Sequence, residues 1–159
     1  MLFIYVCNIN TMKHLLFLTL LLFTTPIFSQ IKVEDVGDGW KNKIELALEI
    51  IKKTDSNYYS HVINNCKHIG FWSGKYSTNE DSSIYMTKYD FEINSIQNLA
   101  CIIVHESKHI ELSKNKIVLS EKEEECICYT YEKEFLFKVE VPERRLLENV
   151  FYRLESFCN

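Results

Sequence analysis

Hydrophobic residues recur at three- and four-residue steps after Gly39, which predicts an amphipathic helix that ends near Lys53. The positions that form this stripe are Trp40, Ile44, Ala47, Leu48 and Ile51. Residues 55–65 continue with a similar but shorter pattern. We therefore expect a second, shorter helix directly after the first.

The spacing of hydrophobic positions changes between residues 68 and 91. Two segments, 68–77 and 83–91, are rich in aromatic and β-branched residues and predict β-strands. The polar stretch 77–82 between them is typical of a loop. We expect the two strands to pair as an antiparallel hairpin.

Two further helices are predicted from sequences typical of a capping box. Asn94 is followed three residues later by Gln97, which predicts a helix that runs to about residue 112. Ser120 is followed by Glu123, which predicts a helix that runs to about residue 140. The connection of seven residues between them suits an antiparallel pair of helices.

The C-terminal segment predicts one more helix, with Pro142 in its first turn, where proline is tolerated. Its apolar face consists of Leu146, Leu147, Val150, Phe151, Leu154 and Phe157. Together these elements predict an α+β fold, in which a small antiparallel sheet packs on a helical body.

Residues 1–29 have the three parts of a secretory signal peptide. Met12 is the better initiator, because a lysine follows it and the apolar run 15–23 comes next. This run is short for a membrane span, and Pro26 ends it. We expect cleavage after Ser29 and export to the periplasm or the medium. The alternative is an uncleaved N-terminal anchor.

The remaining 130 residues are enough for one domain with its own core. Removal of residues 1–29 takes away one lysine and no acid, so the net charge changes from −4 to −5. This acidity, with no basic stripe, argues against nucleic acid as a partner. No stable membrane span is expected after cleavage of the signal peptide.

Six cysteines become five when Cys7 is removed, and an odd number leaves at least one thiol unpaired. The only close pair is Cys126 and Cys128, which does not match a zinc ribbon. Spacing does not reveal any pairing. We expect Cys101, Cys126 and Cys128 to be buried free thiols in helices.

The predicted helix over residues 94–112 contains the sequence His105-Glu106-Ser107-Lys108-His109. Residues four apart share one face of a helix, so both imidazoles can reach one ion. Zinc suits such a site because it keeps an open coordination position and lowers the pKa of its water. Glu106 lies beside that position and can act as general base and then general acid.

The helix that carries these histidines is expected to be buried where it reaches them, because residues 99–104 are nearly all apolar. Ser107 and Lys108 are expected on its solvent side. The alternative to a metal site is a pair of histidines satisfied by hydrogen bonds. His61 and His68 have no motif spacing and are interpreted as surface or strand residues.

A catalytic zinc needs a third protein ligand. The motif HExxHxxGxxH would require glycine at 112 and histidine at 115, but the chain has Leu112 and Asn115. On the next predicted helix, Glu124 and Glu125 lie at the level of His109 and beside the buried arc. Helical geometry alone leaves both of them open.

The combination of VHESKH (104–109) with a following helix that reads Glu125-Cys126-x-x-Tyr129-Thr130 resembles the gluzincin class of zinc metallopeptidases. Compact members of that class, the minigluzincins, have a similar size. The resemblance implies a zincin-like domain in which His105, His109 and Glu125 bind zinc. It covers about residues 99–137 and lacks the thermolysin-type NExxSD signature.

The same resemblance implies that the strand before the HExxH helix, residues 84–89, borders the cleft and pairs with an extended substrate. An ordinary sheet strand is the alternative. Tyr129 and Tyr152 are candidates to donate a hydrogen bond to the oxyanion. The aromatic pairs 58–59 and 71–72 are more typical of a core than of a cleft.

These observations predict an exported zinc-dependent peptidase with a peptide or protein substrate. Two other classes stay open: a binding module that retains a zinc site, and a disulfide-linked interaction domain without a metal.

Overall fold

The computed structural model describes residues 31–74 and 77–159, and this part of the chain confirms the predicted α+β class. Its helices are α2 (Trp40–Thr54), α3 (Ser56–Asn65), α4 (Lys88–Ile93), α5 (Ile96–Lys114), α6 (Glu121–Lys138) and α7 (Arg144–Cys158). Its strands are β1 (Lys32–Val33), β2 (His68–Trp72), β3 (Thr78–Glu80) and β4 (Ser83–Thr87). The predicted signal peptide lies outside the described residues. No helix among those described has the length and apolarity to cross a membrane.

The four strands form one mixed sheet in the order β1-β2-β4-β3. β2 and β4 pair in parallel, with Ile69 opposite Ile84, so the predicted hairpin between these two strands is wrong. The hairpin lies instead between β3 and β4, with Asn79 opposite Ile84 and a positive φ of 52° at Asp81 in the turn. The predicted loop 77–82 contains the edge strand β3. Its polar residues gave no strand signal, because edge strands tolerate polar residues, and this explains why the pairing was predicted wrongly.

β4 ends at Thr87, four residues before the predicted end of that strand. Thr87 caps α4 instead: its Oγ1 accepts a hydrogen bond from the Asp90 backbone N–H at 3.1 Å. The Asp90 carboxylate accepts in return from the Thr87 N–H, also at 3.1 Å. This capping box outweighs the strand propensity of the residues that follow.

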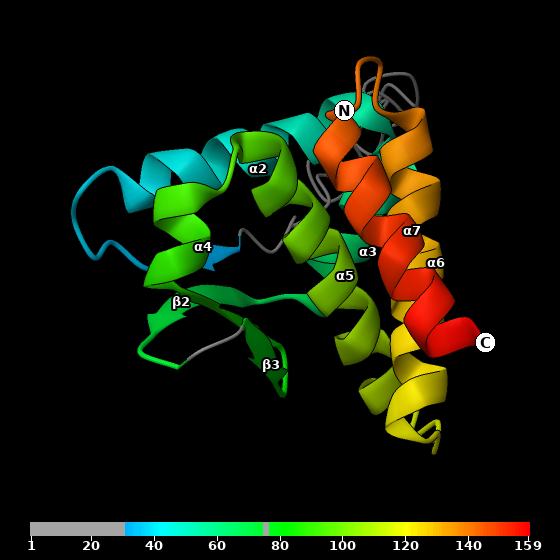
Figure 1. Cartoon of the computed structure of the whole chain (residues 1–159). Helices are drawn as coiled ribbons and strands as arrows, with labels where there is room; N and C mark the ends of the chain where they lie inside the picture. Colours follow the sequence, from blue (N-terminus) through cyan, green and yellow to red (C-terminus); the bar gives the residue numbers. More distant parts are fainter. Residues whose placement is uncertain (1–30, 75–76) are drawn as a thin grey trace, which may run out of the picture.

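Helix α5 is the central element, with the sheet on one side and α6 and α7 on the other (Figure 1). It begins one residue later than predicted, because its cap is Ser95, whose Oγ accepts from the Asn98 N–H at 3.1 Å. Gln97 has a different role. Its Nε2 donates to the Val141 carbonyl and its Oε1 accepts from the Glu143 N–H, at 3.1 and 2.6 Å. Gln97 therefore fixes the connection between α6 and α7 against α5.

The hydrophobic core surrounds α5. Leu99, Ala100, Cys101, Ile103 and Val104 are all fully buried, as the apolar run predicts. Each large apolar side chain contributes about 1.5–3 kcal/mol when buried, so α5 is held rigidly where it carries the histidines. The predicted stripe of α2 packs in the same core.

The prediction that Ser107 faces solvent is wrong. Ser107 is fully buried, and its Oγ donates to the Val104 carbonyl at 2.7 Å. The neighbouring Lys108 is half-buried and forms an ion pair with Glu111. The HExxH segment is therefore enclosed on more sides than its sequence indicates.

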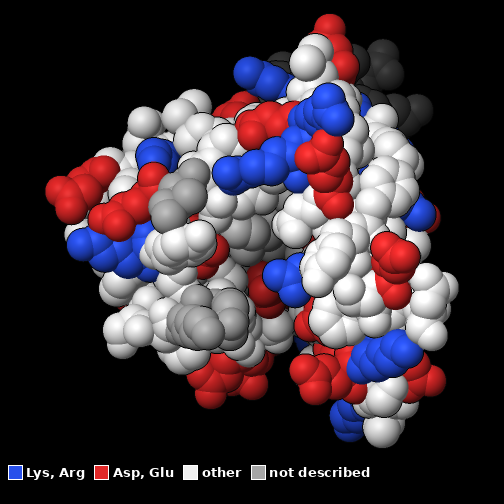
Figure 2. All heavy atoms as spheres, viewed as in Figure 1, with Lys and Arg blue, Asp and Glu red and all other residues white. Residues whose placement is uncertain are grey.

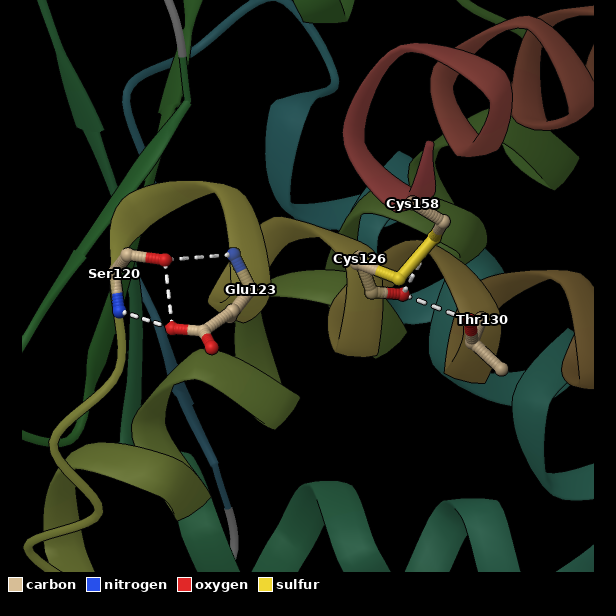
Figure 3. Close-up of a disulfide and its surroundings, with 5 residues drawn as sticks. All are labelled: Ser120, Glu123, Cys126, Thr130 and Cys158. Carbon is tan, nitrogen blue, oxygen red and sulfur yellow. Dashed lines mark hydrogen bonds between the residues drawn. A yellow bond between two sulfur atoms is a disulfide. The ribbon is translucent and has the colours of Figure 1, made fainter.

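Helix α6 begins at the predicted capping box of Ser120 and Glu123, and a disulfide joins it to the last turn of α7 (Figure 3). The disulfide links Cys126 to Cys158 across a Cα–Cα distance of 5.1 Å. The expectation of a free thiol at Cys126 is wrong, because packing of α6 against α7 brings together residues 32 positions apart. Cys101 and Cys128 are buried free thiols, as predicted.

Candidate metal centre

The two histidines of the HExxH sequence converge on one point beside α6. The Nε2 atoms of His105 and His109 lie 3.1 Å apart. The chain reverses direction between α5 and α6, so the first turns of α6 lie beside this pair (Figure 1). Glu125 places one carboxylate oxygen 3.5 Å from His105 Nε2 and the other 3.4 Å from His109 Nε2. One ligand atom from each of the three residues lies within 4.8 Å of the other two.

These separations match the requirements of a tetrahedral zinc site. At Zn–ligand distances of about 2.0–2.1 Å, two neighbouring ligand atoms of a tetrahedron lie about 3.3 Å apart. The Nε2–Nε2 separation of 3.1 Å is close to this value, and each Nε2 has its own oxygen of Glu125 at 3.4–3.5 Å. The residues present therefore fit the ion, with its fourth position left for water or substrate.

Two further carboxylates contact the opposite nitrogens of the same imidazoles. Glu132 Oε2 lies 3.1 Å from His105 Nδ1, and Glu124 Oε1 lies 2.7 Å from His109 Nδ1. A carboxylate at Nδ1 orients the ring and fixes the tautomer that leaves Nε2 free to bind a metal. Glu125 therefore faces the metal side of the histidines, whereas Glu124 faces their rear.

Glu132 was not recognised in the sequence, although it is buried and lies seven residues after Glu125. Seven residues are nearly two helical turns, so both side chains project from the same face of α6. This spacing is the signal that could have identified it.

The carboxylates change the protonation of the metal-free site. Burial alone would lower the pKa of His105, but Glu125 and Glu132 outweigh this effect and raise the pKa to about 10. The pKa of His109 is also raised, because Glu125 and Glu124 outweigh its desolvation. Burial would raise the pKa of Glu125, but its contacts with the two histidines lower it to about 2. Without an ion, these contacts thus favour protonated imidazoles beside an ionised Glu125 carboxylate.

Glu106 is buried on the sheet side of the histidines, and its Oε2 accepts a hydrogen bond from Asn79 Nδ2 at 2.9 Å. Asn79 lies on β3, in the segment that the sequence predicted to be a loop. No sequence signal indicated this residue. The contact holds the Glu106 carboxylate in a fixed position beside the candidate metal site.

A cleft of about 730 Å³ opens over the site. It is visible as a hollow with the sheet and α4 on one side and helices α6 and α7 on the other (Figure 2). Both acidic and basic atoms reach into this hollow. Residues of the cleft that bear on the chemistry are Asp90, His105, Glu106, Tyr129, Glu132 and Arg153. Asn149 of α7 also lines it.

Tyr129 is the better placed of the two tyrosines considered from the sequence. Its ring centroid lies 4.4 Å from that of His105, and it stacks on Phe157 at 5.7 Å. Burial raises the pKa of Tyr129 to about 12, partly opposed by the charge of Arg153, so the phenol keeps its proton at neutral pH. Tyr152 is 66% exposed and does not line the cleft.

No protein-family model, curated protein or solved structure matches this chain. The resemblance to gluzincins therefore rests on the HExxH helix and on Glu125 with the residues that follow it.

Of the other residues considered from the sequence, only Tyr89, in the segment 84–89, lines the cleft. β4 is an inner strand of the sheet, so residues 84–89 do not form the substrate-binding edge. Tyr58 packs in the core against Tyr131, and Phe71 packs against Trp40, as expected for core aromatics. The two remaining histidines lie on α3 and β2, outside the candidate ligand set.

Proposed function

We propose that this protein is a zinc-dependent metallopeptidase in which His105, His109 and Glu125 bind the metal. The convergence of the two Nε2 atoms, 3.1 Å apart, with the Glu125 carboxylate, whose two oxygens lie 3.4 and 3.5 Å from them, carries the proposal. The carboxylates of Glu124 and Glu132 support it, because they occupy the positions that commonly orient metal-bound histidines.

When bound, zinc would polarise the scissile carbonyl and lower the pKa of a water molecule. Glu106 would accept the proton of the attacking water and deliver it to the amine that leaves. Asn79 holds the Glu106 carboxylate in place for this transfer. Tyr129, with a protonated phenol next to His105, is positioned to donate a hydrogen bond to the oxyanion.

The edge strand β3 is the best candidate to align a peptide in the cleft. It is the last strand in the sheet order and pairs with β4 alone among the described strands. It also contacts α5 and carries Asn79. An extended peptide that pairs with this edge would pass directly over Glu106.

We also propose that the protein is exported. The disulfide between Cys126 and Cys158 supports this, because disulfides form and persist in oxidising compartments. The predicted signal peptide is the second reason.

The proposal is tested by zinc analysis and peptide cleavage with the purified chain. We expect about one zinc per chain and hydrolysis of a mixed peptide library. Glu106→Gln should retain zinc but lower the cleavage rate at least about 100-fold, because it removes the general base. Glu111→Gln, on the same helix but paired with Lys108, is the matched control and should remain active.

Absence of zinc in the wild-type protein would contradict the proposal. Zinc without cleavage, or cleavage unaffected by Glu106→Gln, would instead favour a binding module that retains a metal site.

A further inference from the structure

We propose that Arg153 makes the cleft selective for substrates that carry a carboxylate close to the scissile bond, an inference that rests on the proposed peptidase function. The carboxylate can be the free C-terminus of the peptide or the side chain of an aspartate or glutamate.

Arg153 is the only arginine or lysine among the described residues that line the cleft. The three acids that share the lining each already have a polar partner. Asp90 accepts from Ser77 Oγ at 2.7 Å, Glu106 accepts from Asn79 at 2.9 Å, and Glu132 contacts His105 at 3.1 Å. These acids therefore do not need Arg153 as a counter-ion.

The guanidinium group of Arg153 forms no hydrogen bond or ion pair with any residue in the described parts of the chain. Arg144, on the same helix, differs: its Nε donates to Glu148 at 2.7 Å. An arginine that points into a cleft with all of its donors unused is available to bind a ligand.

The packing of α7 fixes where Arg153 lies. Arg153 and Phe157 are four residues apart and share one face of the helix, and Asn149 lies one turn earlier on that face. Phe157 stacks on Tyr129 with an interplanar angle of 13°, and Tyr129 packs on His105. This series of contacts places Arg153 one helical turn from Phe157, which connects to the candidate metal site through Tyr129 and His105.

The chemistry of the side chain identifies the ligand. Guanidinium stays charged at every physiological pH and presents paired N–H donors that match the two oxygens of a carboxylate. Three acids in the lining disfavour a second carboxylate near them, so the permanent charge of Arg153 favours a substrate carboxylate at the α7 side of the cleft. The Asn149 amide, which also lines the cleft, can add one more donor.

Four fluorescein-labelled peptides of one sequence test this inference. They combine a C-terminal carboxylate or amide with an internal Glu or Gln. Binding to the zinc-loaded Glu106→Gln chain is measured by fluorescence anisotropy, so cleavage does not interfere. We expect one of the two carboxylates to tighten binding about tenfold over its neutral counterpart. The pair of peptides that shows the difference identifies the source of the carboxylate.

Arg153→Gln should abolish this preference and leave the affinity for the neutral peptide unchanged. Arg145→Gln is the matched control, because Arg145 is exposed on the same helix and does not line the cleft. Equal binding of all four peptides, or a preference that survives Arg153→Gln, would overturn the inference. Failure of the proposed function would be detected in a separate experiment, in which the wild-type chain binds no zinc or does not cleave peptides. The binding comparison does not require catalysis, so it decides the role of Arg153 whether or not the wild-type chain cleaves peptides.

Discussion

Each histidine of the candidate centre has a carboxylate at both of its ring nitrogens. Glu125 lies at the Nε2 atoms, whereas Glu132 and Glu124 lie at the Nδ1 atoms of His105 and His109. Buried ionisable groups are costly unless they are paired or bind a metal. When the histidines are protonated, both ring nitrogens of each can donate to a carboxylate. When they are neutral, their Nε2 atoms can bind an ion.

Removal of the Glu132 carboxylate should weaken zinc binding without removing a ligand. Glu132→Gln is expected to lower zinc affinity about 10- to 100-fold, because the His105 ring loses its charged orienting partner. Competition with a chromophoric chelator measures this affinity. Glu134→Gln, an exposed acid on the same helix, should leave it unchanged. Equal affinities in the two variants would show that Glu132 does not support the site.

Zinc binding should release protons and strengthen as the pH rises. The pKa of His105 is about 10, so it holds a proton at pH 7 that the ion must displace, and the raised pKa of His109 adds to the competition between protons and zinc. Calorimetry in buffers of different ionisation enthalpy should detect one to two protons released per zinc. Affinity that does not change between about pH 6 and pH 9 would contradict this account.

The same raised pKa affects the stability of the metal-free chain. Protonation of His105 stabilises the fold fully below pH 6.5, the ordinary pKa of a histidine in the unfolded chain. This contribution is lost as the pH rises toward 10, the pKa of His105 in the folded chain. Glu125 acts in the opposite direction, because its pKa is lowered to about 2. Its contribution is present above its ordinary pKa and is lost as the pH falls toward 2.

At the residue scale, the sequence predicts the part of the site that depends on helical spacing alone. His105, Glu106 and His109 follow from one motif, whereas the choice of Glu125 came only from the resemblance to gluzincins. Asn79 and Arg153 could not be predicted, because each reaches the cleft from another element through tertiary packing. Short-range patterns carry no information about such contacts.

At the scale of elements, the disulfide connects the helix that carries Glu125 to the helix that forms the far wall of the cleft (Figure 3). Cys126 directly follows Glu125, and Cys158 directly follows Phe157, which stacks on Tyr129. The disulfide therefore holds the end of α7, and with it the wall that carries Arg153, close to the candidate metal.

Replacement of both cysteines by serine should destabilise the protein but spare the metal. A cross-link between residues 32 positions apart contributes about 3–4 kcal/mol in the chain-entropy account. The Cys126→Ser/Cys158→Ser chain should therefore unfold at a lower denaturant concentration and still bind one zinc, because its ligands lie on α5 and α6. An unchanged unfolding midpoint would show that the disulfide does not stabilise the fold.

Every helix of the described residues except α4 was predicted, because helix signals are local; α4 lies in a segment predicted as a strand. The sheet was predicted less well because its pairing is not local. The stripe of α2 and the cap of α6 are present in the structure as predicted. The parallel pairing of β2 with β4 depends on the polar strand β3, which had no hydrophobic alternation to reveal it. The early end of β4 was indicated in the sequence by Thr87 and Asp90, a capping pair that was overlooked.

At the scale of the whole molecule, the candidate site lies where α5 and the sheet meet the α6–α7 pair (Figure 1). An ion held by both α5 and α6 would link these halves, so binding should stabilise the entire fold. The apolar core packs around α5 and does not depend on the ion, so the metal-free chain should stay folded.

Removal of zinc should lower the melting temperature without unfolding the protein at 25 °C. Zinc at about 100 times its dissociation constant adds about 2.7 kcal/mol, which corresponds to a shift of about 10 °C for a domain of this size. Calorimetry before and after treatment with a chelator measures the shift. Glu125→Gln should show little or no shift, and a similar shift in this variant would place the zinc elsewhere.

The most direct test of the account compares the zinc affinity of the wild-type chain with those of Glu125→Gln and Glu124→Gln, measured by chelator competition at one pH. We expect Glu125→Gln to lose high-affinity zinc binding, because it removes a ligand. Glu124→Gln should retain one zinc with at most about a 100-fold weaker affinity, because it removes only the partner of His109 Nδ1. A Glu125→Gln chain that binds zinc as tightly as the wild type, or a greater loss in Glu124→Gln, would contradict the proposed centre.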